Sequence, residues 1–292
     1  MKTQHQWTRW CAWVALGLIA TISQTAGCSD MTGSMMAQTG FLSERGNWRS
    51  GPNAEISGMS AKDVFKDPQT LALVEAACHG DIPKIDALVK QGANVNATGY
   101  RDMSVLAWAM ACKSYRGTER LLELGANPNF KMKETGDISP TWIAAGSRDP
   151  RWLPMMLAHG GYPNITGPGG FRSALSLAIE QNRMQNVQLL LDHGANVNEH
   201  DSGGNSAATD AAALAKFDAV EMLLKHGYDY NLQDLTNAVY VEHIPPNDPK
   251  HAAWLRVLQI LAAKGFHPNV VPHIGGPPPG LAPPSSDGGG HP

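Results

Sequence analysis

Short apolar stretches recur along residues 67–269, and their internal spacing predicts helices with one buried face. In the segment NVQLLLDH, residues 186–193, the apolar side chains Val187, Leu190 and Leu191 lie three and four positions apart. Such side chains share one face of a helix. The preceding segment, SALSLAIEQN, predicts a shorter helix whose small alanines allow close packing against a neighbour.

A glycine and a polar turn follow this predicted helix pair. Gly194 is expected to end the second helix, because glycine adopts a left-handed backbone without a Cβ clash. Ala195 and Val197 are expected to pack under the turn, whereas Asn196 and Asn198 are expected to bond nearby backbone groups. The polar residues that come next predict a hairpin.

The pattern of an apolar helix, a glycine and a polar turn occurs six times along the chain. A period near 33 residues is typical of stacked repeats, in which no unit can bury its apolar face alone. The recurring glycines are Gly92, Gly125, Gly160, Gly194, Gly227 and Gly265, with spacings of 33, 35, 34, 33 and 38.

The first half of each unit resembles the Thr-Pro-Leu-His-x-Ala-Ala opening of the ankyrin repeat. SPTWIAAGS (139–147) and SALSLAIEQ (173–181) carry the resemblance best, and LVEAACHGD (73–81) matches from its leucine onward. The chain therefore resembles an ankyrin-repeat protein over about residues 67–269. The resemblance implies an all-α solenoid of about six helix-turn-helix units with hairpin fingers. Its concave face would be lined by the inner helices and the fingertips.

The ends of the repeat array have features of their own. Ser60 with Asp63 three residues later predicts a capped helix start. Unit six carries a proline-rich insertion at residues 242–251. We assign residues 60–273 to the repeat domain. Residues 28–59 are predicted to be a flexible tether, and the Gly/Pro-rich residues 274–292 a disordered tail.

The first 27 residues have the layout of a signal peptide. Lys2 and Arg9 precede an apolar stretch at residues 11–23, which is shorter than a membrane span. The following TAGC, residues 25–28, resembles the lipobox of bacterial lipoproteins, and this resemblance implies lipidation of Cys28. Thr25 departs from the usual Leu, and ordinary cleavage near Gly27 is the alternative.

The lipoprotein resemblance and the net charge bear on the compartment and on the partners. An Asp directly after the lipidated cysteine tends to hold such lipoproteins in the inner membrane, and this chain has Ser29 there. The resemblance therefore implies the outer membrane, on its periplasmic side. Removal of residues 1–27 would leave 21 basic and 26 acidic residues, a net charge of −5. That charge argues against nucleic acid as a partner. We expect contact with the membrane through the lipid anchor only.

Two further cysteines, Cys78 and Cys112, lie near the ends of predicted inner helices in neighbouring units. A disulfide needs Cα atoms within about 7 Å, and stacked helices lie about 8–10 Å apart. This comparison favours two buried or partly buried thiols, with pairing as the alternative.

We found no motif that predicts catalysis, and we expect no cofactor and no enzyme activity. The GPGG at residues 167–170 lies at a predicted fingertip and lacks the frame of a nucleotide loop. His159, His193 and His226 recur before the glycine, which spaces them too widely for one metal ion. We interpret them as caps of helix C-termini.

The predicted partner surface combines fingertips with the ends of inner helices. Aromatic side chains, Met and Arg are enriched at interfaces, which drew attention also to Phe130, Trp108 and Trp142. The predicted binding residues are Tyr100, Arg101, Asp102, Lys131, Met132, Lys133, Phe171, Arg172, Glu180, Gln181, His200 and Asp201. Further inner-helix positions are Cys78, His79, Ala111, Cys112, Ala213 and Leu214.

These features predict an exported module that acts by binding another protein. Exported ankyrin lipoproteins resemble immunity proteins that neutralise type VI secretion toxins, notably phospholipases. The alternative is a periplasmic scaffold or helper of an envelope or oxidative-stress enzyme such as catalase, which the two thiols would suit. An enzyme is disfavoured because no nucleophile–base pair or metal cluster was found.

Overall fold

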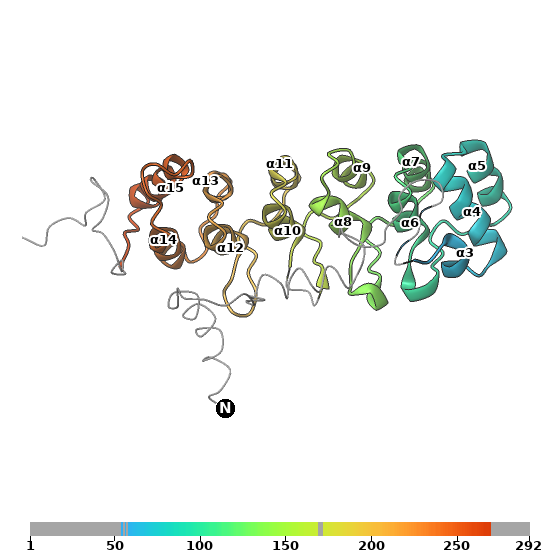
Figure 1. The fold of residues 1–292 in the computed structure, drawn as a ribbon, viewed down its shortest axis with the longest axis horizontal. Coiled ribbons are helices and arrows are strands. Elements are labelled where there is room, and N and C mark those ends of the chain that lie inside the picture. The colour runs from blue at the N-terminus through green and yellow to red at the C-terminus, as the bar shows by residue number, and fades with distance from the viewer. Residues whose placement is uncertain (1–53, 55, 57, 169–171, 270–292) are drawn as a thin grey trace, which may run out of the picture.

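The computed structural model describes residues 54, 56, 58–168 and 172–269. Within them, six helix pairs stack in one row, with the inner helices on one side and the outer helices on the other (Figure 1). The inner helices are α4 (Pro68–His79), α6 (Val105–Ala111), α8 (Pro140–Gly146), α10 (Ala174–Glu180), α12 (Ala207–Ala213) and α14 (Leu232–Val241). The outer helices are α5 (Ile82–Lys90), α7 (Tyr115–Glu123), α9 (Trp152–Ala158), α11 (Met184–Asp192), α13 (Phe217–Lys225) and α15 (His251–Ala263).

Hairpin fingers connect the first five units and point away from the outer helices (Figure 1). Each finger closes through an isolated antiparallel bridge, and the bridged pairs are Thr98–Ser104, Met132–Ile138, Thr166–Ser173 and His200–Ser206. Two fingers carry short 3-10 helices, η1 (Tyr100–Asp102) and η2 (Lys133–Thr135). The predicted all-α solenoid of six units with fingers is confirmed.

Small residues let the inner helices pack on both sides. Every residue of α6 and of α8 is buried, and in α10 only Glu180 is not fully buried. The serine before each of these helices accepts a hydrogen bond from a backbone N–H of the first turn, which satisfies a donor that the helix itself cannot. The predicted face of α11 is also confirmed, since Val187, Leu190 and Leu191 are buried.

Asparagine side chains in the turns hold each unit to the next one. Asn129 is typical: its amide donates to the Gly160 carbonyl at 2.8 Å, and its Oδ1 accepts from the Tyr162 N–H at 2.8 Å. These bonds satisfy backbone groups of the next turn that no helix satisfies. In the same way, the Oδ1 atoms of other turn asparagines accept hydrogen bonds from backbone N–H groups of the next turn. These pairs are Asn96 with Asn127, Asn164 with Asn196, and Asn198 with Asp229, at 2.8, 2.6 and 3.0 Å.

The two ends of the repeat array agree with the sequence-based predictions, except at residues 54 and 56. Ser60 and Asp63 cap the short helix α3 (Ala61–Val64), because the Ser60 backbone N–H and hydroxyl both donate to the Asp63 carboxylate, at 2.9 and 2.6 Å. Ala54 and Ile56 lie within the predicted tether, yet both are buried against the core. The insertion of unit six lies between α14 and α15, as expected.

The two cysteines form a disulfide, which corrects the preference for unpaired thiols. The Cα atoms of Cys78 and Cys112 are 5.3 Å apart. The spacing of helix axes was the wrong measure, because these residues face each other across the contact. Beside the disulfide, Gly117 lets α7 pack close to the end of α4, since a Cβ there would lie 1.9 Å from the Ala77 carbonyl oxygen.

Replacement of Gly194 by Val should destabilise the protein by about 1–2 kcal/mol, because φ is +81° and a β-branched residue is strained there. No atom lies within 4 Å of the added Cβ, so the cost is conformational. Denaturant unfolding measures it. Gly194→Asn is the matched control and should lose less, since Asn tolerates this region. Equal stability of Gly194→Val and wild type would contradict the turn assignment.

Reduction of the disulfide should destabilise the first two units by about 3–4 kcal/mol, because the bond closes a loop with a sequence separation of 34. Unfolding curves with and without reductant measure this loss. Cys112→Ala is the control, because its curve should not respond to reductant. Identical wild-type curves under both conditions would contradict a bond that constrains the unfolded chain.

Candidate protein-binding surface

The first two fingers are tied together at their tips. Tyr100 is 58% exposed and lies beside Arg101, whose backbone is left-handed with φ of 56°. The Arg101 guanidinium donates two hydrogen bonds to the Glu134 carbonyl, at 2.7 and 3.1 Å. Tyr100 is thus presented to solvent on a fixed support, whereas Asp102 is half-buried.

The second finger presents Lys133, and it buries one residue that was predicted to bind. Lys133 is exposed, and the half-buried Lys131 donates to the Thr166 hydroxyl of the next finger at 3.0 Å. Met132 is 0% exposed, which corrects its assignment to the partner surface. It is bridged with the buried Ile138, and side chains alternate between the two faces of an extended segment.

The fourth finger is shaped by Asp201. Its carboxylate accepts hydrogen bonds from the Gly203 and Asn205 N–H groups at 2.8 and 2.9 Å. The exposed His200 stacks on Tyr230 with 3.9 Å between ring centroids. This finger therefore presents an ordered turn, and its His200 is held against the half-buried Tyr230, which precedes α14 (Leu232–Val241).

Charged side chains gather on the inner side of units four and five. Arg172 forms an ion pair with Glu180 at 3.1 Å, and both side chains are mostly buried. Burial raises the pKa of the Glu180 carboxyl, and Arg172 opposes this rise. Burial also raises the pKa of the Asp210 carboxyl, again against the effect of Arg172. Arg172 pairs with only one of these two partly desolvated carboxylates, so a cationic group of a partner would relieve the cost of burying them.

Sequence reasoning missed Asp210, although a signal was present. It is the one charged residue in α12, whose sequence is AATDAAA. In a helix of small residues that stacks on both sides, a carboxylate can only face the open concave side. Alignment on the repeat pattern drew attention to the helix ends and away from this position.

Several predicted inner-helix positions belong to the core instead. Cys78, Ala111 and Cys112 are buried, which corrects their placement on the binding surface. Trp108 and Trp142 are each 1% exposed. Trp108 packs edge-on against Phe65, with 5.7 Å between ring centroids, and Gly167 of the third finger lies against the Trp142 ring. Trp142 donates its indole N–H to the Arg172 carbonyl at 3.2 Å. His79, Ala213 and Leu214 are exposed, and Gln181 and Phe130 are half-buried.

Two of the three recurring histidines act as helix caps. The Nδ1 atoms of His193 and His226 each bond a carbonyl of the preceding turn, at 2.8 Å, which confirms the capping interpretation for both. Among the residues that the structure describes, no group of three or more His, Cys, Asp or Glu side chains could hold a metal ion. Phe171 and Cys28 lie outside the described residues.

Comparison with known proteins agrees with this geometry. A family model described as ankyrin repeats (3 copies) matches residues 142–234. The chain is similar to a solved ankyrin repeat domain from Acinetobacter baumannii, with a TM-score of 0.54 and 25% identity over 66% of this chain and 97% of that one. The chain folds as an ankyrin-repeat solenoid.

Two relatives show how much of the chain is shared. Human ankyrin repeat domain-containing protein 63 is 32% identical over 144 residues, which are 48% of this chain and 34% of that protein. Protein PhlB of Serratia liquefaciens is 28% identical over 150 residues, 51% of this chain and 65% of that protein. The chain thus spans about a third of the first relative and just under two thirds of the second. No helix in the described part is long and apolar enough to cross a membrane.

Replacement of Asp210 by Asn should stabilise the protein near neutral pH. Burial raises the pKa of Asp210, so this carboxyl binds its proton more tightly in the folded state than in the unfolded state. The protonated carboxyl therefore favours the folded state at low pH, and this contribution to the free energy of unfolding is lost as pH rises through the folded-state pKa. The difference in unfolding free energy between Asp210→Asn and wild type should therefore grow from about pH 4 upward. Denaturant unfolding across pH measures it, and the exposed Glu119→Gln controls for the loss of one negative charge. A difference independent of pH would contradict the raised pKa.

Proposed function

We propose that this protein is exported, anchored by a lipid on Cys28 in the periplasm, and binds and neutralises a toxic effector. The disulfide between Cys78 and Cys112 carries this proposal, because such bonds persist in oxidising compartments and are rare in the cytosol. It staples the first two units of the module. Export and the lipid anchor rest further on the signal-like residues 1–27 and the TAGC at 25–28.

The inhibitor role rests on the shape and chemistry of the finger surface. Blocking a toxin needs only tight coverage of its substrate cleft, and a stable interface buries about 800 Å² on each partner. The exposed Tyr100 provides an aromatic anchor of the kind that dominates binding energy. The Glu180 and Asp210 carboxylates around Arg172 suit a cationic side chain of the partner. A secreted phospholipase of the type VI secretion class is the proposed target.

The relatives support a bacterial setting for this proposal. Protein PhlB and the ankyrin repeat domain from Acinetobacter baumannii both come from bacteria. Their similarity covers the repeats, and the partner of this chain is therefore inferred from its own surface.

The test has two parts, of which the first addresses the anchor. In the native cell, wild type should incorporate labelled palmitate and sediment with membranes, whereas Cys28→Ala should do neither. Cys112→Ala is the matched control, because it removes a cysteine and should keep the label. Absence of label in wild type would remove the lipid anchor from the proposal.

The second part addresses the partner. Capture with the tagged full-length protein should recover a secreted lipase or similar toxin, and the purified pair should show inhibition of that enzyme. Tyr100→Ala should weaken inhibition by about tenfold or more, and the fold should be unchanged because Tyr100 is exposed. Recovery of a catalase or an envelope component, without inhibition of a toxin, would replace the inhibitor by a helper function.

A further inference from the structure

Four outer helices begin at basic residues, which is unusual for a helix start. The residues that precede α9, α11, α13 and α15 are Arg151, Arg183, Lys216 and Lys250, and none of them caps its helix with a side-chain hydrogen bond. Helix starts favour Ser, Thr, Asp or Asn, and a positive charge at this end opposes the helix dipole. The repeat thus places a row of cations along the turns between inner and outer helices.

Three of these cations have partners that explain them. Arg183 donates to the Gly146 carbonyl at 3.1 Å, and Lys216 donates to the Ile179 and Glu180 carbonyls at 2.7 and 2.9 Å. These carbonyls end the inner helix of the preceding unit, where helix carbonyls need donors. Arg151 is paired with Asp149 at 2.8 Å.

Lys250 is the exception, because the insertion of unit six breaks the pattern. Residues 242–250 separate α14 from α15, and α15 has 13 residues where α13 has 9. In the part of the chain that the structure describes, the Lys250 ammonium makes no hydrogen bond or salt bridge, although Glu242 lies near enough to be affected by its charge. The fourth cation is therefore left available.

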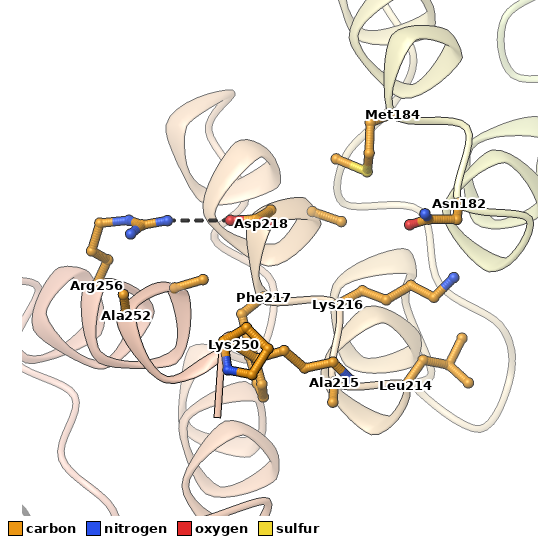
Figure 2. Close-up of a pocket in the computed structure, with 13 residues that line it drawn as sticks. Asn182, Met184, Leu214, Ala215, Lys216, Phe217, Asp218, Lys250, Ala252 and Arg256 are labelled. Atoms are coloured by element: carbon orange, nitrogen blue, oxygen red, sulfur yellow. Dashed lines mark hydrogen bonds and ion pairs between the residues drawn. The ribbon is translucent and has the colours of Figure 1, made fainter. Parts of the chain in front are cut away.

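Lys250 lines a groove of about 500 Å³ that crosses the turns of units four, five and six (Figure 2). Met184 and Leu214 lie on one side and Arg256 on the other, with Lys250 between them (Figure 2). Leu214 is 46% exposed, and the floor includes the buried Phe217. Pro249 and Lys250 of the insertion thus form part of the wall of this partly apolar depression.

Among the residues that line this groove, cations outnumber carboxylates, although the whole chain has a net negative charge. Lys216, Lys250 and Arg256 line it, and Asp218 is the one carboxylate among the lining residues. Arg256 is already paired with Asp218 at 3.2 Å and with Glu221 at 2.8 Å, so the two lysines are the cations left to attract an anion. Burial lowers the pKa of Lys216, Glu180 opposes this, and Arg183 and Lys250 lower it further. The two lysines therefore repel each other, and an incoming anion would relieve that repulsion.

We propose that this groove docks an acidic segment of a partner protein. A carboxylate of the segment meets Lys250, and an aliphatic or aromatic side chain beside it packs on Leu214 and Met184. The cations belong to different units with apolar surface between them, an arrangement that fits an extended segment better than a small anion. The groove lies at the helix turns and away from the fingertips, although it includes Leu214, one of the predicted inner-helix positions. The proposal does not rest on the inhibitor function.

Selection of random peptides displayed on phage, with the full-length protein as bait, tests this proposal. The enriched peptides should combine Asp or Glu with a Leu or Phe. Binding of a labelled enriched peptide, measured by fluorescence anisotropy, should weaken about tenfold in Lys250→Glu and in Leu214→Gln, and less in Lys250→Gln. It should also weaken as salt is added.

Matched controls separate this surface from the fingers. Tyr100→Ala should leave peptide binding unchanged, and a peptide with its Asp and Glu replaced by Asn and Gln should not bind. Lys250 and Leu214 are both exposed, so their variants should fold, which thermal melting checks. Enrichment without acidic residues, absence of enrichment, or binding that Lys250→Glu leaves intact would overturn the proposal.

Discussion

The structure depends on the asparagine that bonds from each unit to the backbone of the next turn. Asn129 bridges to Gly160 and Tyr162, and the same type of contact recurs along the array. Apolar burial alone would allow neighbouring units to slide or rotate against each other, because it has no direction. A side-chain amide with fixed donors and acceptors allows one register. Helix packing, the fingers and both proposed binding surfaces inherit their positions from that register.

Most of the fold was predictable because each unit repeats the same local sequence pattern. The glycines, the apolar faces and the serine caps act within one unit, so each could be inferred from a short stretch such as 173–198. Contacts between units were harder. The Cys78–Cys112 pairing was missed because a typical spacing of helix axes does not give the distance between two facing residues. Gly117, which lets α7 pack close to the end of α4, has no distinctive sequence context either.

The candidate site was predicted only in outline. Tyr100, Lys133 and His200 lie exposed on fingers as expected, since fingertips are polar and protrude. Met132 was assigned to the wrong face because the direction of one side chain in a hairpin depends on its bridge partner, Ile138. The groove beside Lys250 was not foreseen. It lies where the insertion interrupts the repeat, and the repeat pattern does not predict the structure of an inserted segment.

The disulfide makes the two ends of the array unequal. A stack in which each unit contacts only its neighbours opens from its ends, and local opening follows the least constrained element. The bond joins units one and two, whereas unit six is held by one neighbour and carries the inserted loop. Opening of the array therefore begins at α14 and α15 and proceeds toward the N-terminus. A molecule that loses its last unit keeps its first three fingers in place, so the repeats that present Tyr100 outlast those that form the groove.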